Sequence, residues 1–368
     1  MKIDKNHVLE VLSNLKDPLT GENIVRSGRV KEVNIVEGSG KINCKLTLPD
    51  AFTQQEKSKL NFDSITLLQE HFPKAEVHIH LETDLTKGKS SQNVLPQVSN
   101  ILAIASGKGG VGKSTVSVNL AVALHRLGFK VGILDADLYG PSIPAMVGLK
   151  GKRPEVKEVD GRPKIIPLEA FGLPVMSLGF IIEPEQAVVL RGPRLAGIIK
   201  QFIQECIWQT LDFLILDLPP GTGDIQLTLV QTVPITGAIM VTTPQEVALA
   251  DAIKAMNMFR MTTIDVPIIG VIENMSWFTP NELPDNKYYL FGKGGGEKLA
   301  AIAEVELLGQ IPLIQSIMQS GEDGKPIGLD EERSGKGDIW LEVAKKTERQ
   351  VRLRNENYRP TKIVDIKT

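Results

Sequence analysis

Residues 101–115 constrain the fold more than any other stretch, because a strand pattern, a glycine-rich loop and a helix pattern follow one another there. The segment reads ILAIASGKGGVGKST, and Gly107, Gly112, Lys113 and Ser114 fill the spacing G-x-x-x-x-G-K-[ST]. An apolar run precedes the loop, and apolar residues at helical spacing follow it. Glycines let backbone N–H groups approach phosphate oxygens, and the N-terminus of a helix adds partial positive charge. The stretch therefore predicts a phosphate-binding loop.

The residue types in this loop give each position a part in holding a nucleotide. We expect Lys113 to reach the β- and γ-phosphates and Ser114 to ligate Mg²⁺. The other positions expected to contact the nucleotide are Gly107, Lys108, Gly109, Gly110, Val111, Gly112 and Thr115. The alternative is a chance glycine-rich turn, and the flanking strand and helix patterns argue against it.

Two later segments supply carboxylates at the ends of predicted strands. KVGILDAD ends in Asp135 and Asp137, whose side chains share a face because they lie two residues apart in a strand. FLILDLPP places Asp217 after an apolar run, where its carboxylate would organise Mg²⁺ through water. We expect a weaker supporting role for Asp135 near the same ion. Because ligands bind at the carboxyl ends of parallel strands, these groups should face Lys113.

Hydrophobic patterning divides the chain into a small unit and a larger one. Residues 1–85 predict a small α/β (α+β) domain with two helices, a hairpin, a third strand and an antiparallel sheet. Residues 86–99 are polar and read as a linker. Residues 100–347 alternate strand and helix patterns, which predicts an α/β P-loop NTPase fold with a mostly parallel, doubly wound sheet. Residues 348–368 read as a polar, basic tail.

Length and composition allow two or three domains and weigh against some classes of function. The chain has 368 residues, 42% of them hydrophobic, and a formal net charge of −2. Such a charge gives no general attraction to nucleic acid or to an anionic membrane. We see no signal-peptide core and no apolar run long enough to span a membrane, so we expect a cytoplasmic protein. We expect Cys44 and Cys206 to be small buried hydrophobic residues.

Lys108 gives the loop a closer resemblance. K-G-G-x-G-K-[ST] resembles the deviant Walker A group of dimeric ATPases, which includes partition, division-site and nitrogenase-iron-protein relatives. The resemblance implies a homodimer in which Lys108 reaches the partner subunit's nucleotide, and it implies that Asp137 orients the attacking water. Asn274, in VIENMS, matches the asparagine that reads the purine in that group, and an asparagine in an ordinary turn is the alternative. The implied nucleotide is ATP.

Further motifs make the chain similar to Mrp-type ATPases, which are proposed iron–sulfur cluster carriers. They are GKGGVGKST, DADLYGPSIP, Arg191-Gly192-Pro193, LDLPPGTGD, TTPQEVALAD, VIENMS, FGKGGGEKLA and GQIPL. The segment LKDPLTGENIVRSGRVKEVNI in the first unit resembles the small iron–sulfur assembly domain that precedes many such ATPases. The resemblance implies a [4Fe–4S] cluster and, as partners, iron–sulfur assembly proteins or client apoproteins rather than nucleic acid or membrane.

The chain departs from that family at the cluster motif. Many members have C-P-x-C between the segments that correspond to VIENMSWF and FGKGGG, and four thiolates from two subunits would hold the cluster. Here the segment reads TPNELPDNKYYL, without cysteine. Thr279, Asn281 and Glu282 offer hard or neutral oxygen donors, which do not replace soft thiolates. The residues themselves support the ATPase, whereas the cluster is implied by resemblance only.

Two other functions stay open on the sequence. A partition or positioning ATPase would bind DNA or membrane instead of clusters, and the near-neutral charge and the first unit argue against it. A nucleotide-binding scaffold would not turn ATP over, and the intact Asp137 and Asp217 argue against that.

Overall fold

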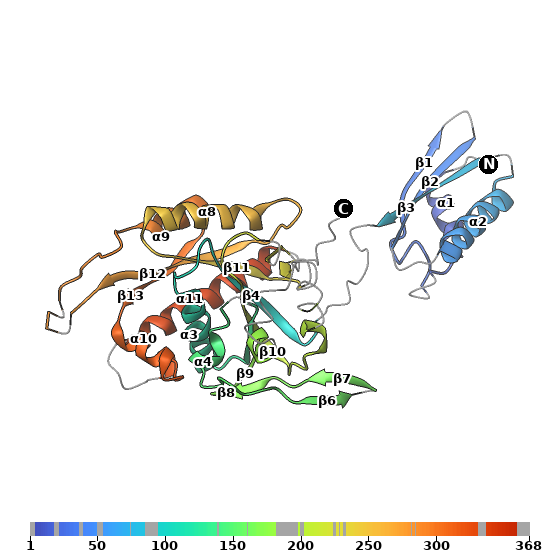
Figure 1. Cartoon of the computed structure of the whole chain (residues 1–368). Coiled ribbons are helices and arrows are strands. Elements are labelled where there is room, and N and C mark those ends of the chain that lie inside the picture. The colour runs from blue at the N-terminus through green and yellow to red at the C-terminus, as the bar shows by residue number, and fades with distance from the viewer. Residues whose placement is uncertain are drawn as a thin grey trace. The chain divides into compact units, whose positions relative to one another are not determined.

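The structure is a computed structural model of the chain, and it separates into two compact units, Met1–Gln92 and Asn93–Thr368 (Figure 1). It describes residues 4–17, 22–36, 40–49, 54–73, 75–84, 95–137, 140–159, 161–181, 198, 202–223, 226–227, 229–230, 233–280, 282–283, 285–329 and 336–358. Of the residues singled out in the sequence, Arg191-Gly192-Pro193 and Asn281 lie outside these ranges.

The first unit packs two helices against a three-stranded sheet. Its elements are α1 (Lys5–Leu12), β1 (Val30–Val36), β2 (Lys41–Pro49), α2 (Gln54–His71) and β3 (Glu76–Asp84). Helix α1 begins after Asp4, whose carboxylate accepts a hydrogen bond from the backbone N–H of His7. The core of the unit includes Val8, Ile24, Ile42, Cys44 and Leu68.

The sheet of this unit corrects one expectation. Strands β1 and β2 are antiparallel, as predicted, but β2 and β3 are parallel. The expectation of an antiparallel sheet was therefore wrong for the second pair. The reason is that helix α2 lies between β2 and β3. It carries the chain back to the end of the sheet at which β2 begins, so β3 runs in the same direction as β2.

The second unit is built on an eight-stranded sheet. Its strands, in spatial order, are β13 (Glu306–Leu313), β12 (Ile268–Phe278), β11 (Gly237–Thr242), β4 (Val98–Ser106), β10 (Leu211–Asp217), β5 (Val131–Asp135), β9 (Leu173–Ser177) and β8 (Leu168–Ala170). All neighbours pair in parallel except β8 and β9. The prediction of a mostly parallel sheet is confirmed, and β4 lies inside it, flanked by β11 and β10.

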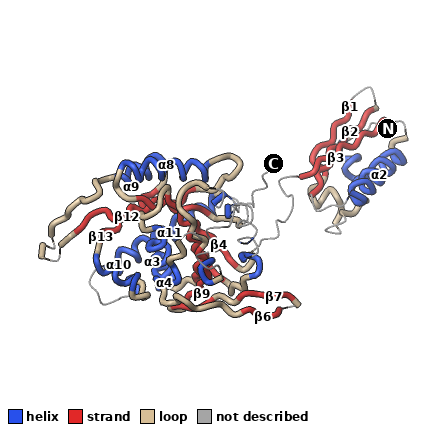
Figure 2. The backbone as a smooth tube through the Cα atoms, viewed as in Figure 1, coloured by secondary structure: helices blue, strands red, loops and turns tan. Residues whose placement is uncertain are grey.

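Helices cover both faces of this sheet (Figures 1 and 2). Helices α8 (Glu246–Arg260) and α9 (Gly295–Ala303) pack on one face, and α3 (Lys113–Arg126) and α11 (Lys336–Asn357) on the other. Every residue of β5 and of β11 is buried, as expected for parallel strands covered on both sides. Further helices among the described residues include α4 (Ile143–Met146) and α10 (Gln315–Glu322), and short 3-10 turns lie at Leu178–Phe180 and Ile327–Leu329.

The second unit differs from the predicted pattern in three places. An antiparallel hairpin, β6 (Val156–Val159) and β7 (Arg162–Ile165), was not predicted, because β6 is exposed along its whole length and carries no buried face. Strand β4 begins at Val98, two residues before the boundary placed at 100. Helix α11 continues past the boundary placed at 347, and Val351 is buried in the core. Among the described residues, no helix is both long and apolar enough to cross a membrane.

Candidate nucleotide-binding site

The P-loop connects β4 to α3 at the carboxyl edge of the sheet, and two kinds of constraint require its glycines. Gly110 and Gly112 have φ angles of 81° and 80°, in the left-handed region that favours glycine. A Cβ atom on Gly107 would lie 2.1 Å from the backbone carbonyl carbon of Asp251, so α8 packs directly on the loop. The loop backbone is therefore set both by its own conformation and by the helix beside it.

Three side chains from the start of α3 converge on Asp217 at the end of β10. The Nζ atom of Lys113 lies 2.8 Å from Oδ2 of Asp217, and the hydroxyl of Ser114 donates to the same oxygen at 2.7 Å. The hydroxyl of Ser117 donates to Oδ1 of Asp217 at 2.5 Å. The side chains of Lys113 and Asp217 are 6% and 0% exposed. The structure thus brings together Lys113, Ser114 and Asp217 as the sequence predicted.

This group fits a magnesium site. The Ser114 hydroxyl and the Asp217 carboxylate are hard oxygen donors, which Mg²⁺ prefers, and they lie 2.7 Å apart. Within the described part of the chain, no three His, Cys, Asp or Glu side chains form a metal site by themselves. Mg²⁺ keeps several waters and takes phosphate oxygens beside one or two protein ligands.

Asp137 lies at the Lys113 end of this cluster. Its Oδ2 atom is 3.7 Å from Nζ of Lys113, and its side chain is 12% exposed. The carboxylates lie at one strand end as expected, since Asp135 pairs in register with Asp217, and the backbone N–H of Asp137 donates to Asp135. The Asp137 carboxylate is therefore within reach of the Lys113 ammonium group, which we expect to contact the γ-phosphate. Its role toward water stays a prediction.

Asp135 is fully buried and holds its neighbours. One carboxylate oxygen accepts a hydrogen bond from the backbone N–H of Asp137 at 3.1 Å, and the other accepts from the hydroxyl of Ser177 at 2.9 Å. Burial and, to a smaller extent, the negative charge of Asp217 raise the pKa of Asp135 to about 8, against the hydrogen bond from Ser177. The raised pKa favours the protonated form of Asp135, and the hydrogen bond to the Asp137 N–H makes this side chain a support for the backbone of Asp137. Its weaker role near Mg²⁺ stays a prediction.

Lys108 lies at the surface of the P-loop, pointing to α8. Its Nζ atom donates to Oε1 of Gln245 at 3.3 Å, and its backbone carbonyl accepts from the hydroxyl of Ser106 at 3.0 Å. The residue is partly exposed, as a lysine that reaches another subunit would need to be. The reach itself stays a prediction.

Asn274 packs against the P-loop from β12. Its side-chain amide donates to the backbone carbonyl of Val111 at 2.8 Å, and a Cβ on Gly112 would lie 2.1 Å from the same nitrogen. Asn274 is buried, so it is not an asparagine in an exposed turn. The contact ties β12 to the phosphate loop, and recognition of a purine by Asn274 stays a prediction.

Four further residues shape this edge, and none of them was predicted from the sequence. Ser117 carried a usable signal, because it lies four residues after Lys113 and so on the same helix face. Ser177 ends β9 and pairs in register with Asp135, which only the strand order reveals. Gln245 contacts Lys108 across the loop. Glu273 is buried and accepts from the backbone N–H of Gly296 at the start of α9, and no sequence pattern pointed to it.

The two cysteines are unsuited to hold an iron–sulfur cluster. Cys44 lies in the first unit and Cys206 in the second, and both are buried. Burial raises the pKa of the Cys44 thiol to about 11 and that of the Cys206 thiol to about 12. Thr279 and Glu282, beyond the end of β12, offer oxygen donors only. The described residues therefore do not fit a cluster site at this segment.

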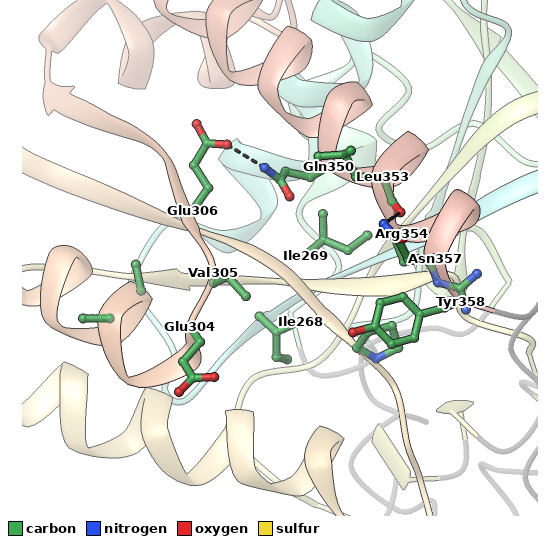
Figure 3. A pocket seen from close by; sticks show the side chains of 13 residues that line it. Ile268, Ile269, Glu304, Val305, Glu306, Gln350, Leu353, Arg354, Asn357 and Tyr358 are labelled. Atoms are coloured by element: carbon green, nitrogen blue, oxygen red, sulfur yellow. Dashed lines mark hydrogen bonds between the residues drawn. The ribbon is translucent and has the colours of Figure 1, made fainter.

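A separate cavity of about 510 Å³ lies at the opposite edge of the sheet (Figure 3). It is lined by the beginnings of β12 and β13 and by the ends of α9 and α11, including Ile268, Glu306, Gln350 and Tyr358. The amide of Gln350 donates to Glu306 at 2.7 Å. Because the P-loop follows the carboxyl end of β4 and this cavity adjoins the amino ends of β12 and β13, it is not part of the nucleotide site.

The fold and the site define a nucleotide-binding P-loop protein whose phosphate loop lies at the carboxyl edge of a parallel α/β sheet. A family model described as NUBPL iron-transfer P-loop NTPase matches residues 97–348, and one described as iron-sulfur cluster assembly protein matches residues 5–65. The chain belongs to the NUBPL iron-transfer P-loop NTPase family and carries an iron–sulfur assembly domain in front. The resemblance stated from the sequence motifs is confirmed.

Known proteins agree with this assignment. A protein of Synechocystis named iron-sulfur cluster carrier protein is 42% identical over 338 residues, which cover 92% of this chain and 95% of that protein. A solved nucleotide-binding protein of Archaeoglobus fulgidus, in complex with ADP and with cobalt, is 34% identical with a TM-score of 0.57, covering 68% of this chain and 95% of that one. The cell division ATPase MinD of Pyrococcus furiosus shares the fold, with a TM-score of 0.51 at 23% identity over 68% of this chain and 99% of its own.

Proposed function

We propose that this protein is a Mg²⁺-dependent ATPase that works as a homodimer in iron–sulfur cluster assembly. The observation that carries the proposal is the convergence of Lys113 and Ser114 on the buried Asp217, with Asp137 3.7 Å from the same ammonium group. The phosphates of a nucleoside triphosphate bound to the P-loop would bring their negative charge next to this group. A P-loop lysine contacts such phosphates, and a hydroxyl and a carboxylate hold the magnesium ion bound to them.

The chemistry asks the protein for positioning and charge neutralisation. Backbone N–H groups of the P-loop and the N-terminus of α3 hold the phosphates, and Lys113 leaves Asp217 to contact them. Magnesium, when bound, neutralises charge on the β- and γ-phosphates. Asp137 orients the attacking water, and its backbone is held by Asp135. Lys108 completes the partner subunit's site, as the resemblance to dimeric ATPases implies.

The relatives named as carriers suggest that the cargo is an iron–sulfur cluster. This chain lacks thiolates at the segment after β12, and burial disfavours ionisation of Cys44 and Cys206. In this proposal, assembly proteins or client apoproteins hold the cluster on their own thiolates, and the nucleotide cycle of this protein acts on them. The first unit, which matches an assembly domain, is the part of the chain we assign to those partners.

The experiment that tests the ATPase is steady-state phosphate release from ATP and Mg²⁺ by the full chain. Lys113→Ala removes the ammonium group and should lower turnover at least about hundredfold, since removing one charge-stabilising group from a transition state costs on that order. Lys325→Ala, at an exposed lysine far along the chain, is the control and should keep turnover. Equal turnover in Lys113→Ala and the control would refute the site, and binding of ATP without any turnover would favour the scaffold alternative.

A further inference from the structure

Gln245 lies directly before α8 and uses its side chain in an unexpected way. It occupies the N-cap position, with φ −63° and ψ 137°, but its side chain makes no capping hydrogen bond to the helix. Instead its Oε1 atom accepts from Nζ of Lys108 at 3.3 Å. The amide is therefore directed at the P-loop and not at the helix that it precedes.

The backbone around Gln245 is fixed from two sides. The close approach of α8 to Gly107 places the helix directly on the P-loop. A Cβ on Gly295 would lie 2.5 Å from the carbonyl oxygen of Pro244, so the start of α9 packs on the residue before Gln245. An ion pair between Lys298 and Glu246 also joins α9 to the first residue of α8. The acceptor oxygen of Gln245 is thus carried by a scaffold that is anchored to the loop it contacts.

Lys108 has the longer side chain of the pair. Its backbone carbonyl is held by Ser106, but a lysine side chain has many accessible rotamers and can direct its ammonium group in many directions. An acceptor whose backbone is held in place favours one orientation of the Lys108 ammonium group before the partner subunit binds. This preorganisation lowers the entropy cost of the contact that Lys108 makes with the partner's nucleotide.

We propose that Gln245 is a positioning residue for Lys108. It holds the ammonium group at the mouth of the P-loop, in the orientation from which Lys108 reaches the nucleotide of the partner subunit. Gln245 acts through Lys108 and does not itself touch the phosphates. This inference rests on the proposed homodimeric ATPase, and it assigns a role to the glutamine of the segment TTPQEVALAD.

The test is a double-mutant cycle on ATP turnover by the full chain, with Lys108→Ala, Gln245→Ala and the two combined. Gln245→Ala should lower kcat about tenfold, the size expected for losing one hydrogen bond to a charged group, and should leave KM for ATP within about twofold. In the Lys108→Ala background it should have no further effect. Gln245→Glu keeps an acceptor oxygen at the same reach and should retain most of kcat.

Gln319→Ala, on α10, is the matched control, because that glutamine donates to Asp323 and lies outside the nucleotide site. Its kcat should equal that of the unmodified chain. If Gln245→Ala lowers kcat as much without Lys108 as with it, Gln245 is merely structural and the inference is wrong. If Lys108→Ala lowers kcat and Gln245→Ala does not, the inference is wrong while the proposed function stands. If Lys113→Ala keeps full turnover, the proposed function fails first, and the inference falls with it.

Discussion

The nucleotide edge of the large sheet and the segment that follows β12 are built in opposite ways. At the nucleotide edge, Asp217 is fully buried and contacts Lys113, Ser114 and Ser117 at once. In the segment beyond β12, the residues from 285 to 290 are exposed, and Leu290 is 61% exposed. The segment is closed by paired backbone hydrogen bonds of 2.8 Å between Phe278 and Tyr288.

The difference shows which residues the fold constrains. A side chain at the nucleotide edge cannot change without leaving buried charges or hydroxyls unpaired, and each unpaired group is costly. Beyond β12, side chains make few contacts with the core, so cysteines can be lost there while the backbone keeps its course. The nucleotide-site residues and the cluster motif therefore lie in separate parts of the molecule, and this chain has the first without the second.

The largest effect should follow from Asp217→Ala, which disrupts the buried contacts at the nucleotide edge. The variant removes the carboxylate 2.8 Å from the buried Lys113 ammonium and leaves it the longer contact to Asp137 at 3.7 Å, which costs about 3–5 kcal/mol of unfolding free energy, and turnover should fall at least about hundredfold. Ser117→Ala removes one donor only and should cost about 1 kcal/mol. Urea unfolding followed by tryptophan fluorescence measures both, because Trp208, Trp277 and Trp340 all lie in the second unit. Equal stabilities of the two variants would contradict the buried ion pair.

A second effect should come from the proton on Asp135. The pKa of this carboxyl is raised from its ordinary value of 3.8 to about 8, chiefly by burial, so between these values the folded protein holds a proton that the unfolded chain has lost. Stability due to this group therefore falls as pH rises through that window, by at most about 1.4 kcal/mol per pH unit. Asp135→Asn removes the titration.

Urea unfolding of Asp135→Asn and of the unmodified chain, measured from pH 5 to pH 8, checks this sign. The variant should gain stability relative to the unmodified chain as pH rises. Glu342→Gln is the control, because that exposed carboxylate has its pKa lowered by a hydrogen bond from Lys345. It should show no such gain. Parallel pH profiles for Asp135→Asn and the unmodified chain would mean that the buried edge holds an ionised Asp135.

Local spacing explains why much of the nucleotide edge could be predicted. The P-loop is encoded within nine residues, from Gly107 to Thr115, and Asp217 follows directly on the apolar run FLIL. The rule that functional groups gather at the carboxyl ends of parallel strands then placed the carboxylates near Lys113. No comparable rule gives the spatial order of strands or the packing of one helix on a distant loop. The contacts of Ser177 with Asp135 and of Gln245 with Lys108 depend on that order.

The same limit explains the errors in the first unit and at the chain's later boundaries. The alternation in β2 and β3 predicted strands, but their relative direction depends on the crossover through α2. The tail that begins at 348 reads as polar because α11 buries few of its residues there. Val351 is nevertheless buried, so one apolar position keeps the helix on the core for a further turn. So few apolar residues give only a weak pattern in the sequence, although one of them is enough to keep the helix packed on the core.

The smallest effect on turnover, and the sharpest test of the comparison, comes from restoring thiolates to the exposed segment. Thr279→Cys combined with Glu282→Cys creates C-P-x-C beyond β12, and two subunits would then present four soft ligands. After anaerobic incubation with ferrous iron and sulfide, this variant should retain iron and sulfide in stoichiometric amounts with visible absorbance. The unmodified chain and the control Thr279→Ser with Glu282→Gln should retain neither.

ATP turnover of the cysteine variant should stay within about twofold of the unmodified chain, since surface substitutions away from buried networks change the fold little. A gained cluster together with unchanged turnover is the result expected if the nucleotide edge and the segment beyond β12 are independent of each other. A stoichiometric cluster on the unmodified chain would break the comparison, because Cys44 or Cys206 would then have to leave its core despite a raised pKa. A large loss of turnover in the variant would break it from the other side, by showing that the segment beyond β12 is coupled to Asp217 and Lys113.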